Sequence, residues 1–250
     1  MFSGAYNESN GNGAVYVFQK LNSNWVQLQK LTSSDLDSTT LQQNFGNRIA
    51  VDVNGSIVAV ATSPVSGSNS SIMVFTSANG NAWYPTAKLF PANDPNISPA
   101  DDDYFAYNFG MSSDGHIIAA GATSYSNNGS NTGAVFIFTD SSGSWQQVNS
   151  ALYDFNDDDY IGYSVSLDSN GLTVVSAGKH TIVTFEGSLI ASPPSRQVSF
   201  QSSFRTPSPT LVLSEIKLNS SAESPSSGSM LLDSGIPMLL LGFLLVLIIL

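Results

Sequence analysis

The stretch that decides the fold is FGNRIAVDVNG, at residues 45–55. Two later stretches align with it without gaps: FAYNFGMSSDG at residues 105–115 and IGYSVSLDSNG at residues 161–171. Each is followed by an apolar run, which reads SIVAVA, HIIAAGA and LTVVSAG in turn. This self-similarity, at a period of roughly 56–63 residues, indicates a chain built from structural repeats. It is stronger evidence for the fold than the secondary-structure propensity of any single segment.

Turn and strand signals subdivide each repeat. Asx-Gly dipeptides are typical of hairpins with type I′ turns, whose two central residues both need a positive φ. They stand at Asn54-Gly55, Asp114-Gly115 and Asn170-Gly171. Runs of β-branched and aromatic residues predict a further strand: GAVYVF (13–18), SIMVF (71–75), GAVFIF (133–138) and TIVTF (181–185). We expect the tryptophans that follow to pack in cores or between sheets: Trp25, Trp83 and Trp145.

Four strands per repeat, packed radially, predict an all-β fold of the β-propeller type. Two strands are expected at residues 2–31, then two whole blades at about 45–89 and 105–150. A last blade at 161–186 shows three strands, and the pattern does not reveal its fourth. The prediction is an incomplete or open propeller of about three to four blades over residues 1–186. Propellers have about 4–8 blades, so three interpretations are open: a piece of a larger propeller, an open array, or part of an assembly in which a second chain completes the propeller.

The repeats resemble the FG-GAP family, whose units form the propeller of integrin α-subunits. The resemblance rests on Phe45-Gly46, on Gly121-Ala122 at the end of a strand and on the run GAVYVF at 13–18. It implies an extracellular binding or adhesion module. The calcium loop of some family members is not intact here, because SSDG (112–115) and DSNG (168–171) lack enough oxygen ligands.

Composition excludes several classes of function. The 250 residues carry 19 acidic and 8 basic side chains, for a net charge of −11. Nucleic acids are not expected as partners, because phosphate binding needs clustered Lys and Arg. There is no cysteine, which excludes disulfides, zinc–thiolate sites and thiol nucleophiles.

Two acidic runs stand at equivalent positions, each just before the repeated stretch. A calcium ion takes carboxylate oxygens, so a Ca²⁺ site is conceivable there, although exposed carboxylates also serve solubility. A catalytic carboxylate pair is a three-dimensional property that the sequence does not show, and we expect no enzyme activity. The candidate metal ligands are Asp101, Asp102, Asp103, Asp157, Asp158 and Asp159.

The C-terminal part differs in composition from the repeats. Residues 187–235 are rich in Ser and Pro and predict a disordered stalk. Residues 236–250, IPMLLLGFLLVLIIL, hold 15 uncharged residues, or about 22 Å as a helix. Three interpretations stay open: a GPI-attachment signal with Ser221 or Ser227 at the modified site, a short transmembrane or tail anchor, and a buried helix.

The expected function is a non-catalytic binding or adhesion module attached to the cell-surface membrane. Its loops, such as those at residues 63–71, 91–104 and 123–133, would bind a protein or glycan ligand, since loops on a rigid frame carry function. If the chain is secreted, the best sequons for glycosylation are Asn69, Asn96 and Asn128. The N-terminal residues do not read as a signal peptide. The alternatives are therefore an intracellular tail-anchored interaction or structural protein, or a truncated fragment of a larger propeller.

Overall fold

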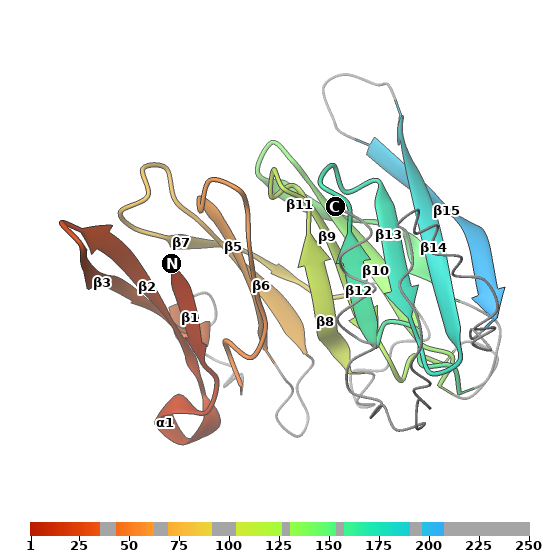
Figure 1. The fold of residues 1–250 in the computed structure, drawn as a ribbon, viewed down its shortest axis with the longest axis horizontal. Helices are drawn as coiled ribbons and strands as arrows, with labels where there is room; N and C mark the ends of the chain where they lie inside the picture. The colour runs from red at the N-terminus through yellow and green to blue at the C-terminus, as the bar shows by residue number, and fades with distance from the viewer. Residues whose placement is uncertain are drawn as a thin grey trace, which may run out of the picture. The chain divides into compact units, whose positions relative to one another are not determined.

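The described residues fold into four antiparallel sheets that follow one another along the sequence (Figure 1). The computed structural model describes residues 1–35, 44–62, 70–91, 104–126, 131–153, 158–190 and 197–207. Strands in each sheet pair in chain order, so every sheet is a simple meander, and none closes on itself. The prediction of an all-β fold is confirmed for the described residues.

The first two sheets lie in the N-terminal half. Sheet 1 contains β1 (Phe2–Ala5), β2 (Ala14–Leu21) and β3 (Asn24–Leu31). A short turn of helix, α1 (Glu8–Gly11), joins β1 to β2, and a 3-10 turn, η1 (Ser33–Asp35), follows β3. Sheet 2 contains β4 (Ile49–Val51), β5 (Ile57–Thr62), β6 (Ser71–Thr76) and β7 (Tyr84–Leu89).

The other two sheets have four strands each. Sheet 3 contains β8 (Phe105–Met111), β9 (Ile117–Ala122), β10 (Ala134–Ser141) and β11 (Ser144–Leu152). Sheet 4 contains β12 (Ser164–Leu167), β13 (Thr173–Ala177), β14 (Thr181–Ile190) and β15 (Gln197–Pro207).

Two strand assignments from the sequence are wrong. Residues 2–31 hold three strands, because β1 pairs with β2 as β9 pairs with β10. The missing fourth strand of the last repeat is β15, which lies within the predicted stalk and pairs with a β14 that runs past residue 186. This pairing has a register shift between Thr184 and Phe185, which interrupts the alternation of side chains between the two faces of the sheet. The segment QVSFQSSF therefore lacks the regular apolar–polar pattern that would have predicted a strand. The rest of the predicted stalk lies outside the described residues.

The hairpin between the first two strands of each repeat forms, but its turn is not type I′. Only the glycine of each Asx-Gly pair has a positive φ: Gly55 at 71°, Gly115 at 78° and Gly171 at 74°. Each glycine N–H donates to the carbonyl three residues earlier, at 3.1, 2.9 and 3.0 Å. This geometry is that of a type I turn whose fourth residue is a left-handed glycine. The turn lies in a four-residue hairpin loop, because the Asp52 N–H donates to the Ile57 carbonyl at 3.0 Å and the equivalent bonds recur at Ser112 and Asp168.

Consecutive sheets share three hydrophobic clusters. One cluster joins sheets 1 and 2, the next joins sheets 2 and 3, and the third joins sheets 3 and 4. Within β5, Val58 and Val60 belong to the first cluster, whereas Ala59 and Ala61 belong to the second. Both faces of such a strand are buried, which explains why its sequence is continuously apolar rather than alternating.

Glycine pairs allow the closest approach between sheets. A Cβ on Gly4 would lie 2.0 Å from the carbonyl oxygen of Gly46, and a Cβ on Gly121 would lie 2.1 Å from that of Gly162. The position of Gly46 and Gly162 is held by Ala106 in the remaining repeat, with a φ of 58°. Backbone therefore packs directly on backbone at two of the three junctions.

The three tryptophans differ in how deeply they are buried. Trp83 is 5% exposed and packs edge-to-face on Phe2, at 5.3 Å between ring centroids. Its backbone N–H and carbonyl are both held by the Gln29 side chain at 2.8 Å, which ties sheet 2 to sheet 1. Trp145 is partly buried against the middle cluster. The packing prediction is wrong for Trp25, which is 54% exposed on sheet 1.

A charged cluster ties the loop of α1 to sheet 1. The Glu8 carboxylate accepts a hydrogen bond from the Tyr16 hydroxyl at 2.6 Å and forms an ion pair with Lys30. Hydrogen bonding with Lys30, and then with Tyr16, lowers the pKa of Glu8 from its ordinary value of 4.5. The same contact with Glu8 raises the pKa of Lys30 and that of Tyr16.

We expect this tie to fail in acid. Since the pKa of Glu8 is lowered in the folded state, its contribution is complete above pH 4.5 and is lost as the pH falls through the folded-state value. Amide hydrogen exchange at Gly13, whose N–H donates to the Glu8 carbonyl at 2.9 Å, should accelerate over that interval beyond its intrinsic pH dependence. The variant Glu8→Gln should show no such step, and an identical step in the variant would contradict the assignment.

Candidate functional site

One tight turn recurs at the start of sheets 2, 3 and 4, where it precedes β4 and β12 and overlaps the first residues of β8. In each, the N–H of the fourth residue donates to the carbonyl of the first, at 3.0, 3.1 and 3.2 Å. The first residue has a φ of 49–55° and the third has a φ of 58–96°. The first and fourth positions are asparagine in sheet 2 but tyrosine in both later sheets. The turns are Asn44 to Asn47, Tyr104 to Tyr107 and Tyr160 to Tyr163.

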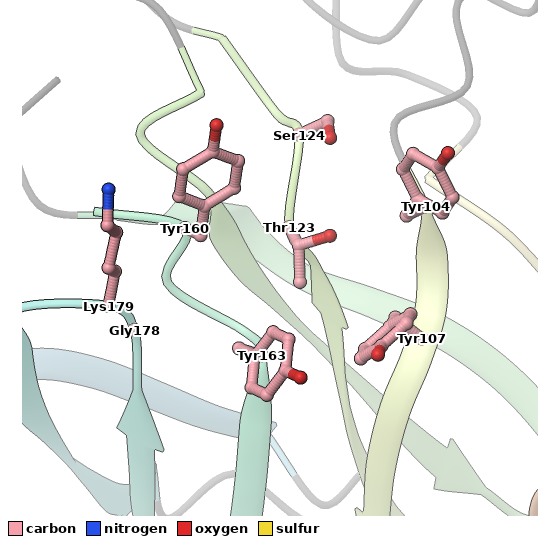
Figure 2. A pocket seen from close by; sticks show the side chains of 8 residues that line it. All are labelled: Tyr104, Tyr107, Thr123, Ser124, Tyr160, Tyr163, Gly178 and Lys179. Atoms are coloured by element: carbon pink, nitrogen blue, oxygen red, sulfur yellow. The ribbon is translucent and has the colours of Figure 1, made fainter. Parts of the chain in front are cut away.

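The four tyrosines of the later turns surround one pocket between sheets 3 and 4 (Figure 2). Its volume is about 430 Å³, within the range of about 300–1,000 Å³ common for small-molecule sites. Sheet 3 also contributes the two residues after β9, and sheet 4 contributes the loop between β13 and β14. The lining residues are Tyr104, Tyr107, Thr123, Ser124, Tyr160, Tyr163, Gly178 and Lys179.

Two of the tyrosine rings face each other across the junction of the two sheets. Tyr107 and Tyr163 have ring centroids 5.2 Å apart and an interplanar angle of 36° (Figure 2). They remain 39% and 58% exposed, so their faces are open to a ligand. Hydrogen bonding with Tyr163 raises the pKa of Tyr107 above its usual 10.0, a shift that Arg48 opposes in part. The Tyr107 phenol is therefore neutral at pH 7.

The wall formed by Thr123 and Ser124 rests on a buried tyrosine. Tyr125 is 1% exposed, and its N–H donates to the Ala122 carbonyl at 3.2 Å. The hydroxyl of Thr132 donates to the Tyr125 carbonyl at 3.1 Å. The Tyr125 ring packs edge-to-face on Phe136, with centroids 5.7 Å apart. These contacts make the wall part of the core of sheet 3 rather than a free loop.

Asp159 and Asp158 directly precede Tyr160, one of the pocket residues, in the sequence. Asp159 is 2% exposed, and its carboxylate accepts a hydrogen bond from the Thr181 hydroxyl at 2.9 Å. Its backbone carbonyl accepts a hydrogen bond from the N–H of Lys179. Asp158 accepts a hydrogen bond from the Asn131 amide at 3.3 Å. Both acidic residues therefore position the turns around the pocket.

The predicted calcium site is not supported by these two residues. Over residues 158–190 and the other described ranges, no three acidic or histidine side chains gather to hold a metal ion. The other four candidate ligands lie outside the described residues: Asp101, Asp102, Asp103 and Asp157.

The remaining predicted sites cannot be placed. The sequons at Asn69, Asn96 and Asn128, the attachment sites at Ser221 and Ser227, and the apolar segment 236–250 all lie outside the described residues. In the part of the chain that is described, no helix has the length and hydrophobicity needed to cross a bilayer.

The sequence analysis missed the tyrosines, although a signal was present. Tyr-x-x-Tyr occurs at the same offset in two consecutive repeats, as Tyr104 to Tyr107 and Tyr160 to Tyr163. Each of the two motifs directly follows an aspartate run, which carried the metal-site prediction instead. The predicted ligand loops at 91–104 and 123–133 do contribute Tyr104, Thr123 and Ser124 to the pocket.

Comparison with known proteins gives no family for the chain. No family model matches it, and no curated protein matches it. Among solved structures, a candidate 6-phosphogluconolactonase from Bacteroides uniformis ATCC 8492 is similar, with a TM-score of 0.46 and 11% identity over 79% of this chain and 52% of that chain. Hsv2 from Kluyveromyces marxianus has a TM-score of 0.46 and 13% identity, over 82% of this chain and 58% of that chain. The GH74 xyloglucanase of Xanthomonas campestris has a TM-score of 0.40 and 11% identity, over 79% of this chain and 29% of that chain. This chain thus spans less than two thirds of each of these structures.

Proposed function

We propose that this chain is a non-catalytic, membrane-attached binding module of the cell surface, and that its ligand binds in the tyrosine pocket between sheets 3 and 4. The observation that supports the proposal is the gathering of four tyrosines from equivalent turns of two consecutive repeats around one cavity. Tyrosine offers a large, rigid, amphipathic contact surface at low conformational-entropy cost, which suits recognition.

The lining chemistry favours binding over catalysis. The described side chains around the cavity offer phenols, aliphatic hydroxyls and one amine, but no carboxylate, imidazole or thiol. Asp159, a buried carboxylate next to Tyr160 in the sequence, accepts a hydrogen bond from the Thr181 hydroxyl and is not among the lining residues. Acid–base chemistry usually depends on such groups poised beside the substrate. The pocket is therefore proposed as a recognition site.

Within this proposal the four sheets are blades of an incomplete β-propeller related to the FG-GAP repeat. The hairpin turns of successive sheets support it, because they form a hydrogen-bonded series. The Val53 N–H donates to the Ser113 carbonyl, and the Ser113 N–H donates to the Ser169 carbonyl, each at 2.9 Å. Equivalent residues thus contact one another from sheet to sheet, as they would around a propeller axis. A second chain would complete the ring.

A panel of small probes tests the proposed site. The full-length chain, ring-labelled with ¹³C at tyrosine and held in detergent micelles, is titrated with cellobiose, cellobiouronic acid, choline and glycyl-tyrosine. At least one probe should shift the ring signals of the four pocket tyrosines and leave that of Tyr84 unchanged, since Tyr84 lies on β7 and is 66% exposed. If no probe shifts the pocket signals, the proposed site is wrong.

Truncation of one platform ring should weaken binding strongly. For the probe that binds in the panel, Tyr163→Ala should reduce affinity about 30-fold, because loss of a tyrosine hot spot costs about 2 kcal/mol. Isothermal titration calorimetry of the variant and of Tyr84→Ala provides the measurement and its matched control. Equal affinity in wild type and Tyr163→Ala would remove the pocket as the binding site.

The membrane side of the proposal is tested separately. On intact cells expressing the full chain, phosphatidylinositol-specific phospholipase C should release a GPI-anchored form, whereas a transmembrane form should stay cell-bound but accessible to surface biotinylation. A chain that neither reagent reaches would favour the intracellular tail-anchored alternative.

A further inference from the structure

The tyrosine pocket has features that restrict the chemistry of its ligand, and this inference rests on the binding function proposed above. We infer that the site binds a sugar ring that carries one anionic substituent, a carboxylate or a sulfate. The inference combines an open aromatic platform, a ring of hydroxyl groups and a single lysine on one side of the same cavity.

The platform requires a ligand with a flat apolar face. Tyr107 and Tyr163 present tilted, half-exposed rings at the floor of the cavity, and Tyr104 and Tyr160 stand above them on either side of Thr123 (Figure 2). The C–H face of a pyranose ring packs on such an aromatic surface. A cavity of about 430 Å³ has room for a mono- or disaccharide.

The hydroxyl groups require a ligand that both donates and accepts hydrogen bonds. Phenols and the hydroxyls of Thr123 and Ser124 act in either role, unlike a carboxylate or an ammonium group. Sugar hydroxyls have the same dual character. A purely aromatic or aliphatic ligand would leave these groups without partners on binding, which is costly.

Lys179 sets the charge of the ligand. It lies beside Tyr160 in the pocket wall, and its backbone is held by the buried Asp159 (Figure 2). Among the described residues no acidic side chain forms an ion pair with it. A lone ammonium in the wall disfavours a cationic ligand such as a quaternary amine and favours an anion, as a point charge without bidentate geometry.

The rest of the molecule limits how many charges the ligand carries. The net charge of −11 repels a polyanion as it approaches, and nucleic acid would need several basic residues in the groove. One lysine matches one anionic group. A saccharide with a single carboxylate or sulfate satisfies the platform, the hydroxyls and the lysine together.

Three matched disaccharides test the inference. Cellobiose, cellobiouronic acid and cellobiose 6′-sulfate share the same rings and differ in the group at one carbon. By calorimetry on the full-length chain in micelles at low salt, at least one charged sugar should bind about fivefold more tightly than cellobiose, the gain expected of one exposed charge pair. The charged sugar that binds more tightly identifies the substituent.

Variants of Lys179 give the decisive comparison. Lys179→Met should abolish the preference for the charged sugar and leave the affinity for cellobiose unchanged, whereas Lys179→Arg should retain the preference. Lys20→Met, on the far end of β2, is the matched control and should change neither affinity. A preference that survives Lys179→Met, or no preference in the wild type, overturns the inference.

The outcomes separate this inference from the binding function itself. If cellobiose, choline or the dipeptide shifts the pocket tyrosines but the charged sugars gain nothing, the anionic-sugar assignment is wrong and the binding site stands. If Tyr163→Ala leaves every affinity unchanged, the pocket is not the site and both proposals fail.

Discussion

Gly162→Ala should lower the free energy of unfolding by about 3 kcal/mol or more and should abolish binding at the tyrosine pocket. Gly162 has a φ of 96°, and an added Cβ would lie 2.6 Å from the Ala134 carbonyl oxygen and 2.7 Å from the Gly121 Cα. A left-handed backbone costs an alanine about 1–2 kcal/mol, and overpacking adds about 1–3 kcal/mol. Because backbone atoms fill the space, neither neighbour can turn away.

The loss of binding follows from the position of Gly162 in the turn. Tyr160 and Tyr163 flank it, so a shift of sheet 4 away from sheet 3 separates the Tyr107 and Tyr163 rings. Thermal unfolding followed by circular dichroism should show a Tm about 6–12 °C lower for the variant. Tyrosine ring shifts with the probe panel measure the binding.

A natural control for this substitution exists in the chain. Ala106 holds the equivalent position in sheet 3, also with a positive φ, of 58°. Ala106→Gly should change stability by less than about 1 kcal/mol, since relief of the left-handed strain is offset by a more flexible unfolded chain. A large destabilisation by Ala106→Gly, or none by Gly162→Ala, would contradict the close-packing account.

Phe136→Ala should destabilise the chain by about 3–5 kcal/mol, the usual effect of removing a buried aromatic ring. Phe136 lies in β10, is fully buried and packs edge-to-face on Phe105 at 6.1 Å and on Tyr125 at 5.7 Å. Both neighbours belong to segments that line the pocket, beside Tyr104 and beside Ser124. The cavity left behind therefore loosens two walls of the site as well as the core.

Denaturant unfolding of Phe136→Ala and Phe136→Leu measures this effect. The leucine variant fills most of the space and should lose no more than about half as much stability. Phe136→Ala should also bind the probe found in the panel less tightly than Phe136→Leu does, at a temperature where both variants are folded. Equal stabilities for the two variants would show that this part of the core tolerates a cavity, against the close packing described here.

The strand content of the fold could be predicted from the sequence because it depends on local patterns. The Asx-Gly turns and the apolar runs after them recur at a fixed spacing, and each marks a hairpin that forms in the structure. The type of turn could not be predicted. The middle residues of the three turns, Asn54, Asp114 and Asn170, keep a negative φ. The side chain at the start of each turn accepts a strand N–H and favours a type I geometry; these side chains are Asp52, Ser112 and Asp168.

The candidate site could be predicted only in part. The loops at 91–104 and 123–133 were expected to bind a ligand, and three pocket residues come from them. Of the aspartates predicted as metal ligands, the structure describes two: Asp159 accepts a hydrogen bond from Thr181, and Asp158 accepts one from Asn131. Side-chain direction in a turn depends on φ at each residue, which a run of identical letters does not reveal.

The sequence by itself determined that this chain is a β-sheet repeat protein, because repeated apolar runs, turn residues and glycine positions are properties of neighbouring residues. Only the tertiary structure decided how the last sheet is completed and where the tyrosine pocket lies. The strand β15 depends on pairing with β14, and the pocket depends on Tyr107 and Tyr163, which are 56 positions apart and meet because glycine lets two sheets approach closely. Contacts between repeats, rather than any local pattern, bring these residues together.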